Sequence, residues 1–496
     1  MKSIDSKTIV WLCSEAVPFA KSGGLADVSG ALPTALAARG HNVFVIMPYY
    51  PKLMGDYNWK LKVRHANLGV PLGTKTRWAQ ILELKFSDRL TFLFIEHHDY
   101  FDRPELYESG GRDFSDNAER FIFLSRAAMQ AILALKLKPD IIHANDWHTA
   151  LACVYLKSHL YKDLPNFSKC ASVLTIHNIA YQGNFSKSLI QLTGLGWEYF
   201  NFHCLEFYDN ICLLKGGIMM AHMLNTVSPA YALETLSPQF GFSLDSPLRE
   251  RAFHGAYRGI LNGIDTEEWN PETDGLIPKN FSDSDMSGKK ICKKALQKEF
   301  SLPISTSTPL LGIVSRLAYQ KGIDVFASAA EEMLKYDDVQ FVILGTGEPW
   351  LQSKLQHLAT TYPAKFAVRI GFSDKTAHMI EAGSDLFVMP SRYEPCGLNQ
   401  MYSMRYGTAP IVRATGGLDD TVKNFSAENP GDSTGFKFWE LYPQALLGTM
   451  RWAASVFRDQ KKSFAKMRGN MMKQDFSWDS TASKYEELYE DAINRL

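Results

Sequence analysis

The sequence predicts an α/β protein built from two doubly wound, parallel sheets. Short apolar runs rich in β-branched residues alternate with amphipathic helical stretches along the 496 residues. This alternation is typical of parallel strands that are covered by helices on both faces. A Gly-Gly pair follows an apolar run once in each half, at Gly23-Gly24 and at Gly416-Gly417. Two such loops indicate a ligand that is held between two domains.

The predicted strands fall into two groups separated by a polar region. In the first half they are residues 8–13, 42–47, 140–143, 172–176, 223–227 and 258–261, and in the second half residues 310–314, 340–344, 367–370, 385–389 and 409–412. Residues 263–309 are rich in Pro, Asp, Ser and Lys and contain one predicted helix, 289–300. We therefore expect a first domain over residues 1–262, a second over residues 263–480, and a final helical segment, 481–496, which the pattern alone assigns to neither.

The composition excludes several classes of protein. Hydrophobic residues make up 46% and charged residues 21%, and Lys plus Arg equals Asp plus Glu at 53 each. A net charge of zero does not favour a nucleic-acid or membrane-surface protein. The seven cysteines are scattered without metal-ligand spacing, so we expect reduced thiols in a cytoplasmic protein. No stretch is apolar enough to predict a signal peptide or a membrane span.

The first glycine loop is suited to an anion. It lies between a predicted strand and a helix over residues 26–38, and Lys21 is beside it. Glycines let a backbone approach a ligand closely, and the amide groups at a helix N-terminus attract negative charge. A diphosphate would bind well there. The alternative is a simple tight turn, because the glycine spacing matches neither the dinucleotide fingerprint nor the P-loop.

Polar residues follow several predicted strands, at the edge where open parallel sheets bind ligands. They are Asn145 and Asp146, His177 and Asn178, Asn262, Arg316 with Lys321, and Glu394 with Cys396. Recurrence across both halves favours one shared site between the domains over independent turns.

Each of these residues also has a structural interpretation. Arg316 and Lys321 could both reach one phosphate, or they could be solvated cations. His177 could bind a sugar hydroxyl or only brace the fold. Glu394 could be a helix cap. We expect Cys396 to be an inert buried thiol. We expect no metal at His97-His98, since adjacent residues of a strand point to opposite faces.

Eight segments together resemble the bacterial and plant-type glycogen (starch) synthases, which are retaining, ADP-glucose-dependent glycosyltransferases. They match in order and spacing over nearly the whole chain: KSGGLADVSGALPTALAARGH from Lys21, HANDWHTALA from His143, TIHNIAYQG from Thr175, TVSPAYALE from Thr226, GILNGIDTEEWNP from Gly259, GIVSRLAYQKGID from Gly312, PSRYEPCGLNQMYSMRYGTAPIV from Pro390 and TGGLDDTV from Thr415. The resemblance implies a glycosyltransferase-B fold, with two Rossmann-like domains facing across a cleft and the final helix packing back on the first.

The resemblance also implies roles for individual residues. His177 and Glu394 would hold the transferred glucose, and Arg316 and Lys321 would stabilise the departing diphosphate. The remaining implied substrate-binding residues are Lys21, Gly23, Gly24, Glu15, Asp27, Asp146, Asn178, Asn262, Phe372 (near the adenine), Cys396, Gly397, Gly416 and Gly417. Many retaining relatives carry a second glutamate seven residues after the first, where this chain has Met401.

The implied reaction transfers glucose from ADP-glucose to the non-reducing end of an α-1,4-glucan with retention of configuration. Lysine and arginine can supply the charge at the phosphates, so we expect no metal and no other cofactor. No carboxylate is obviously placed as a nucleophile, which favours same-face attack through an oxocarbenium-like state. Three alternatives stay open: a transferase that uses UDP-glucose, a glucan phosphorylase, and a silent glucan-binding paralogue. The second lacks a segment suited to pyridoxal phosphate, and the third would be expected to have lost Lys21, Arg316 or Glu394.

Overall fold

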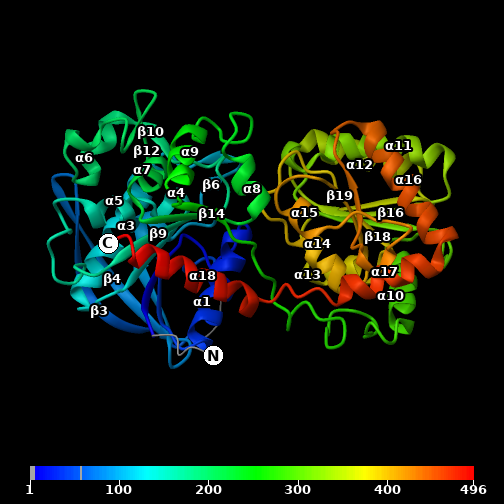
Figure 1. Ribbon diagram of the computed structural model, residues 1–496, viewed down its shortest axis with the longest axis horizontal. Helices are drawn as coiled ribbons and strands as arrows, with labels where there is room; N and C mark the ends of the chain where they lie inside the picture. Colours follow the sequence, from blue (N-terminus) through cyan, green and yellow to red (C-terminus); the bar gives the residue numbers. More distant parts are fainter. Residues whose placement is uncertain (1–5, 56–58) are drawn as a thin grey trace. The chain divides into compact units, whose positions relative to one another are not determined.

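The computed structural model describes residues 6–55 and 59–496. The chain divides into two compact units (Figure 1). The first contains the residues up to Val227, Ala232–Gly263 and Trp478–Leu496, and the second contains Ser228–Tyr231 and Ile264–Ser477. The chain therefore passes from the first unit to the second and returns for its last helix.

The first unit is built around a nine-stranded sheet in the order β14-β13-β9-β8-β1-β2-β5-β4-β3. The strands from β14 to β5 in this order are parallel, and β4 and β3 are antiparallel. In chain order, the bounds are β1 Thr8–Leu12, β2 Asn42–Pro48, β3 Lys62–Leu72, β4 Lys75–Lys85, β5 Leu90–Glu96, β8 Ile141–Asn145, β9 Ala171–Ile176, β13 Met223–Thr226 and β14 Tyr257–Gly259.

The antiparallel edge of this sheet is absent from the sequence prediction. In β3, residues 62–67 are exposed or half-buried, and in β4 only Ala79, Ile81 and Leu82 are buried. An antiparallel edge can leave one face in water, so its strands lack the continuous apolar run of a buried parallel strand. The predicted strands therefore do not include β3 and β4; they also omit β5, although β5 is buried and parallel to β2. Two small sheets complete the unit: β10 (Asn184–Ser186) with β12 (Asn210–Cys212) and β11 (Glu206–Phe207), and β6 (Glu108–Ser109) with β7 (Arg112–Asp113).

Helices cover both faces of the large sheet. The longer ones are α1 (Gly24–Ala38), α3 (Asn117–Ala134), α5 (Leu151–Lys157), α7 (Leu213–Met220), α9 (Asp245–Phe253) and α18 (Trp478–Ile493). Shorter helices are α2 (His98–Phe101), α4 (Asp146–Thr149) and α6 (Ile190–Thr193), and the residues of α8 (Pro229–Glu234) are divided between the two units. The buried strands β1, β8 and β9 lie between these helices and form the centre of the core.

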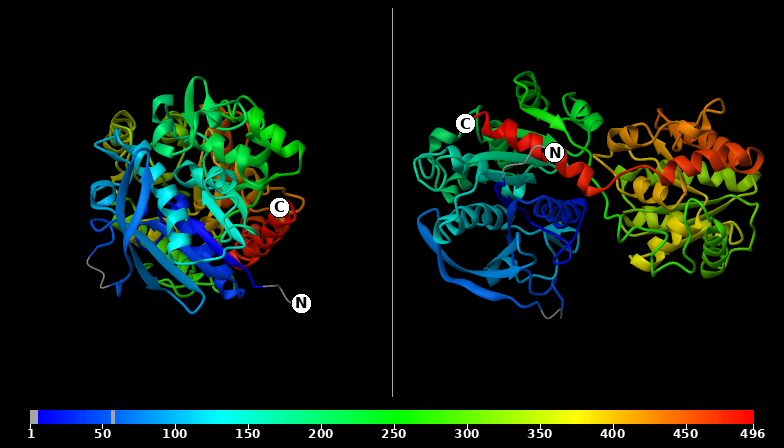
Figure 2. Two further views of the ribbon diagram at one scale, coloured as in Figure 1. Left: turned by 90° about the vertical axis from the view of Figure 1, so that its left-hand side faces the viewer. Right: turned by 60° about the horizontal axis from the view of Figure 1, so that its bottom comes forward.

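The last helix, α18, packs on the first unit beside α1 and β9 (Figures 1 and 2). Arg39 donates two hydrogen bonds of 2.8 Å to the Glu486 carboxylate, and Tyr489 lies 2.8 Å from the buried His143 ring. Asn225 of β13 donates to the Tyr485 hydroxyl at 3.1 Å. Buried polar contacts, rather than apolar packing alone, thus specify where this helix docks.

The second unit has one fully parallel, six-stranded sheet in the order β17-β16-β15-β18-β19-β20. Its strands are β15 Leu310–Val314, β16 Gln340–Gly345, β17 Phe366–Ile370, β18 Leu386–Met389, β19 Ala409–Arg413 and β20 Phe436–Phe438. Its helices are α10 Ser287–Glu299, α11 Ile323–Tyr336, α12 Pro349–Thr361, α13 Asp374–Gly383, α14 Asn399–Arg405, α15 Gly416–Thr421, α16 Pro443–Asp459 and α17 Lys461–Met472. The predicted α/β class with two doubly wound domains is confirmed.

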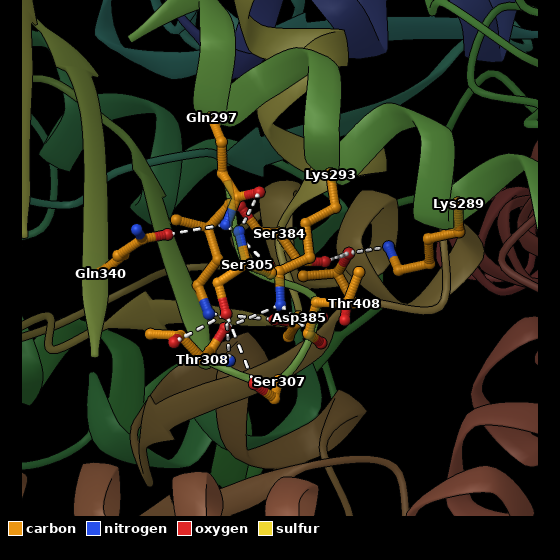
Figure 3. Close-up of polar contacts among 12 residues, drawn as sticks. Lys289, Lys293, Gln297, Ser305, Ser307, Thr308, Gln340, Ser384, Asp385 and Thr408 are labelled. Atoms are coloured by element: carbon orange, nitrogen blue, oxygen red, sulfur yellow. Dashed lines mark hydrogen bonds and ion pairs between the residues drawn. The ribbon is translucent and has the colours of Figure 1, made fainter. Parts of the chain in front are cut away.

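Helix α10 docks on this unit through a polar face. Lys289, Lys293 and Gln297 are spaced four residues apart and point from one side of the helix (Figure 3). The Lys293 ammonium lies 2.6 Å from the Asp385 carboxylate, which also accepts the Leu310 N–H at 2.9 Å. Asp385 thereby ties α10 to the starts of β15 and β18, at the end of the sheet opposite the carboxyl ends of its strands.

The expectation that His97 and His98 lie in a strand is wrong. Strand β5 ends at Glu96, and His98 begins the short helix α2, because His97 turns back to stack on the Tyr100 ring at 4.2 Å. Over residues 6–55 and 59–496, no group of three or more His, Cys, Asp or Glu side chains is arranged to hold a metal ion. The seven cysteines are all buried thiols that form no disulfide. In the same described residues, no helix is both long and apolar enough to span a membrane.

Candidate active site

The polar residues of the first unit gather at the carboxyl ends of three neighbouring strands. Strands β9, β8 and β1 are adjacent and parallel, so Glu15, Asp146 and His177 follow them on one edge of the sheet. All three side chains are buried, with His177 9% exposed. This edge is where an open parallel sheet binds ligands.

His177 is held in one orientation by Asn145, the last residue of β8. The Nε2 atom of His177 lies 2.9 Å from Oδ1 of Asn145, whose Nδ2 donates to the Leu12 carbonyl at 2.9 Å. Because Nδ2 faces a carbonyl, Oδ1 is the atom that faces the imidazole, and Nε2 must carry the proton. Burial lowers the pKa of His177 to about 3, so the ring is neutral and Nδ1 is its acceptor atom.

Asp146 holds the backbone of the His177-Asn178 segment by hydrogen bonds. Its carboxylate accepts the backbone N–H of His177 at 2.7 Å, and the N–H of Asn178 also donates to it. Burial raises the pKa of Asp146 to about 7, although both donors act in the opposite direction. The backbone of Asp146 is left-handed, with φ 53°, a conformation that is uncommon outside glycine and that clusters at functional sites.

Glu15 holds the first glycine loop. Its carboxylate accepts hydrogen bonds from the backbone N–H of Ser22 and, at 3.0 Å, from the Ser22 hydroxyl. Burial raises the pKa of Glu15 to about 7, against the opposing effect of these donors. Glu15 therefore acts on the backbone of the glycine loop.

A sharp backbone turn is the role expected of Gly23 and Gly24, but Gly23 has no conformation that requires glycine. Gly23 is extended, with φ −160°, so its turn needs no special conformation, and a Cβ on Gly23 or Gly24 would meet nothing within 4 Å. The space in front of both residues is open on the side of the α1 N-terminus. Lys21 is half exposed there and pairs with Asp27 at 2.7 Å.

The two asparagines have different environments. Asn178 Oδ1 accepts the Ala180 N–H at 3.1 Å and so stabilises its own turn. Asn262 is 5% exposed, and its Oδ1 has no hydrogen-bond partner among the described residues. A buried acceptor of this kind is available to a ligand or to water.

In the second unit, Lys321 and Glu394 form the central pair. The Lys321 ammonium lies 2.6 and 2.9 Å from the two carboxylate oxygens of Glu394, and the Ser391 hydroxyl donates to the same carboxylate at 2.9 Å. The Glu394 side chain is 7% exposed and that of Lys321 is 21% exposed. Glu394 is thus no helix cap: α14 begins five residues later, at Asn399.

Arg316 lies at the same edge, just beyond β15. Its guanidinium donates to Gln320 at 3.3 Å, and the Gln320 backbone carbonyl accepts the Arg392 N–H at 2.8 Å. Gly322 completes this turn in a left-handed conformation, φ 67°, where a Cβ would lie 1.9 Å from the Pro390 carbonyl oxygen. Only glycine allows the Lys321 segment to approach the Glu394 segment so closely.

The second glycine loop supports the Glu394 segment. The Gly417 N–H donates to the Glu394 carbonyl at 3.1 Å, and a Cβ on Gly417 would lie 2.1 Å from the Cys396 carbonyl oxygen. Gly416 and Gly397 are left-handed, with φ 46° and 71°. The implied contact of Gly416 and Gly417 with the substrate stays a prediction, but the Gly417 amide is not available for it. Its N–H is used within the fold, because α15 packs directly against the Glu394 segment.

Two further sequence-predicted residues are placed as follows. Cys396 is 6% exposed, in keeping with a buried thiol. Phe372 follows β17 and is 76% exposed, so its ring is open to a flat aromatic ligand.

Sequence reasoning placed Asn145 at this edge without its role toward His177, and it missed Gln400 and Arg392. Asn145 orients His177, and Gln400 Nε2 donates to the carbonyls of Cys396 and Gly397 and so ties α14 to the Glu394 loop. Arg392 forms a bidentate pair with Asp324, at 2.7 and 2.8 Å. Their partners lie far away in sequence or are backbone atoms, so no local motif reveals them.

Two Rossmann-like units, each with its polar residues at the carboxyl ends of parallel strands, define the glycosyltransferase-B class. Two family models match the chain: one described as the starch synthase catalytic domain over residues 8–250, and one described as glycosyl transferases group 1 over residues 296–442.

Individual proteins match over nearly their whole length. Glycogen synthase 1 of Geobacter sulfurreducens is 47% identical over 489 residues, which is 98% of this chain and 96% of the relative. A glycogen synthase of an Anaeromyxobacter species is 46% identical, covering 97% of this chain and 98% of the relative. The solved catalytic domain of starch synthase IV from Arabidopsis thaliana, bound to ADP and acarbose, superposes with a TM-score of 0.89 at 32% identity, covering 99% of this chain and 100% of that one. The chain belongs to the glycogen and starch synthase family, and the predicted resemblance is confirmed.

Proposed function

We propose that this protein elongates an α-1,4-glucan by transferring glucose from ADP-glucose to a non-reducing end, with retention of configuration. The observation that carries the proposal is the Lys321–Glu394 pair beside Arg316, within a chain that is 47% identical to a glycogen synthase. The pair places a cation suited to a leaving diphosphate within hydrogen-bond distance of a buried carboxylate suited to sugar hydroxyls.

The proposed chemistry follows from where charge develops. Breaking the bond between glucose C1 and the diphosphate builds positive charge on the sugar and negative charge on the leaving oxygens. Lys321 and Arg316 stabilise the leaving oxygens, and fixed contacts of this kind are worth a few kcal/mol each. When the diphosphate draws Lys321 toward itself, Glu394 becomes available to the glucose hydroxyls.

The first unit supplies the second set of groups. His177 presents a neutral ring with Nδ1 as the acceptor, which suits a sugar hydroxyl that donates. Asp146 and Asn145 keep that ring in place. Lys21, beside the open space at Gly23-Gly24, adds positive charge for the phosphates. We place the reaction in the cytoplasm, which the seven cysteine thiols without a disulfide support.

The direct test measures ADP or UDP release by the purified protein with glycogen and either ADP-glucose or UDP-glucose. We expect release from ADP-glucose, dependence on glycogen, and lengthened α-1,4 chains. Glu394→Gln should reduce kcat by roughly 10²-fold or more. The matched control is Glu331→Gln, which breaks an exposed ion pair of the same unit, Lys335–Glu331 at 3.2 Å, and should leave kcat unchanged. Phosphate-dependent release of glucose 1-phosphate, or no turnover with either donor, would reject the proposal.

A further inference from the structure

A hollow outside the residues described so far lies at the edge of the second unit's sheet. It has a volume of about 420 Å³ and is formed by the end of β20, the loop after it and the first turns of α16. Gly448, on α16, contributes no side chain to it, and a Cβ there would meet nothing within 4 Å. The volume is in the range of small-molecule sites.

Aromatic rings form its walls. Trp439 is 58% exposed and Tyr442 is 48% exposed, and both line the hollow. A third ring, Trp452, is locked by edge-on packing against Phe436 at 4.9 Å. Large aromatic groups left in water on a rigid wall are typical of a binding surface, because covering them is favourable and little side-chain freedom is lost.

The polar groups around the rings do not favour an anion. The Lys437 ammonium, the one cationic group among the lining residues, is paired with Asp419 at 2.7 Å. Glu440 and Gln444 also line the hollow and offer a carboxylate and an amide. Aromatic faces with amide and carboxylate neighbours suit a neutral sugar ring, whose C–H face stacks on an aromatic ring while its hydroxyls form hydrogen bonds. A nucleotide or a phosphate would find no unpaired cation here.

The Arg413 side chain links the loop that lines the hollow to the segment that precedes Glu394. Arg413, the last residue of β19, donates to the Trp439 carbonyl at 3.1 Å and to the Arg392 carbonyl at 2.6 Å. Strands β18, β19 and β20 are consecutive in the sheet. At about 4.8 Å between neighbouring strands, the ends of β18 and β20 are about 10 Å apart. A polymer bound in the hollow therefore stays within a few sugar units of the Glu394 edge.

We infer that this hollow is a second binding site for the acceptor, a neutral α-1,4-glucan chain, distinct from the residues that handle the donor. The inference rests on the proposed function, since it takes its ligand from that reaction. A long glucan that occupies both sites binds the enzyme more tightly than a short acceptor that reaches only one, because its second contact is intramolecular. Long glucans should therefore have a lower KM than maltose, and the hollow should account for part of the difference.

Two variants test the hollow independently. Trp439→Ala removes one stacking ring, and Gly448→Leu fills the space without removing any existing contact. The matched control is Trp350→Ala, which removes a tryptophan of the same unit that is 50% exposed. For both test variants we expect a roughly three- to tenfold weaker affinity for maltoheptaose and a similar rise in KM for glycogen. Turnover with maltose and KM for ADP-glucose should not change.

The outcomes separate the inference from the proposed function. Maltoheptaose binding is measured by calorimetry without a donor, so it does not depend on turnover. Equal maltoheptaose affinity in the wild type and both folded variants overturns the inference, and so does an equal loss in Trp350→Ala. Weakened turnover with maltose also overturns it, because the hollow would then be part of the catalytic site and not a second site for the acceptor. A hollow that binds another protein instead would leave every glucan measurement unchanged. Failure of the wild type to release ADP rejects the proposed function alone.

Discussion

Replacement of Asn145 by alanine should impair catalysis through the tautomer of His177. Asn145 is fully buried and makes two hydrogen bonds of 2.9 Å, from its Nδ2 to the Leu12 carbonyl and from the His177 Nε2–H to its Oδ1. Without the amide, the proton of the His177 ring is no longer restricted to Nε2. A ring with its proton on Nδ1 would present a donor where the proposed reaction needs an acceptor.

The size of the effect follows from these contacts. One net hydrogen bond is worth about 1 kcal/mol, which changes the tautomer ratio about fivefold. We therefore expect kcat to fall by up to about fivefold. The Leu12 carbonyl and the Nε2–H group of the His177 ring also lose these buried partners. This loss should lower the free energy of unfolding by about 2–6 kcal/mol. The stability loss is thus large, while the catalytic loss is modest and specific.

The control must lose stability without touching His177. Asn225→Ala serves, because Asn225 is equally buried, lies two strands away on β13, and makes two hydrogen bonds, with Thr175 at 2.7 Å and Tyr485 at 3.1 Å. Nitrogen NMR of labelled histidine, with His177→Gln to assign the signal, reports the tautomer directly. An Nε2-protonated ring in Asn145→Ala, or an equal loss of kcat in Asn225→Ala, would refute the reasoning.

The variant Asn145→Asp, which puts a carboxylate beside the His177 ring, gives a second, pH-dependent test of the same contact. Burial holds the pKa of His177 at about 3, so the wild type should show no imidazole ionisation in its kcat profile between pH 5 and 8. In Asn145→Asp, a carboxylate beside Nε2 favours the imidazolium and raises this pKa. Protonation of this imidazole should therefore lower the activity of the variant as the pH falls, in addition to the ionisations that it shares with the wild type, such as those of Glu15 and Asp146 near pH 7.

Four further outcomes are expected. Lys21→Ala should raise KM for ADP-glucose roughly three- to tenfold, since one half-exposed charge near the phosphates is lost; unchanged kinetics in the folded variant would contradict this. Lys321→Met removes both contacts to the Glu394 carboxylate and should lower kcat at least 10²-fold. It also leaves a buried carboxylate without its ammonium partner, which should lower the free energy of unfolding by about 3–5 kcal/mol; wild-type stability in chemical unfolding would count against it. Lys293→Met breaks the pair with Asp385, whose side chains are 6% and 10% exposed, and should lower the melting temperature while KM for ADP-glucose stays the same; a changed KM would show that α10 affects the site. Turnover should persist in EDTA, and its loss with recovery on adding Mg²⁺ would refute the assignment of the phosphate charges to lysine and arginine.

The amino-acid sequence by itself determined the class of fold and the edge of each sheet that carries the polar residues. Continuous apolar runs mark buried parallel strands because such strands are covered on both faces, and this signal is local. Residues that follow those runs, such as Asp146, His177 and Glu394, must lie at the carboxyl edge whatever the order of the strands. The hairpin β3–β4 was not predicted, because a strand with one solvent-exposed face carries no continuous apolar run.

Only the tertiary structure decided which of these residues act on one another. Lys321 meets Glu394 across 73 positions of sequence, and Asn145 meets Leu12 across 133 positions. The Gly417 amide turned inward, to the Glu394 carbonyl, although its local pattern matched that of Gly23-Gly24. Strand order and helix docking depend on the burial of the whole chain, so a pairing between strands has no signature in either segment. A pattern in the sequence can therefore place a chemical group at an edge, while its partner, its tautomer and its charge are set by packing.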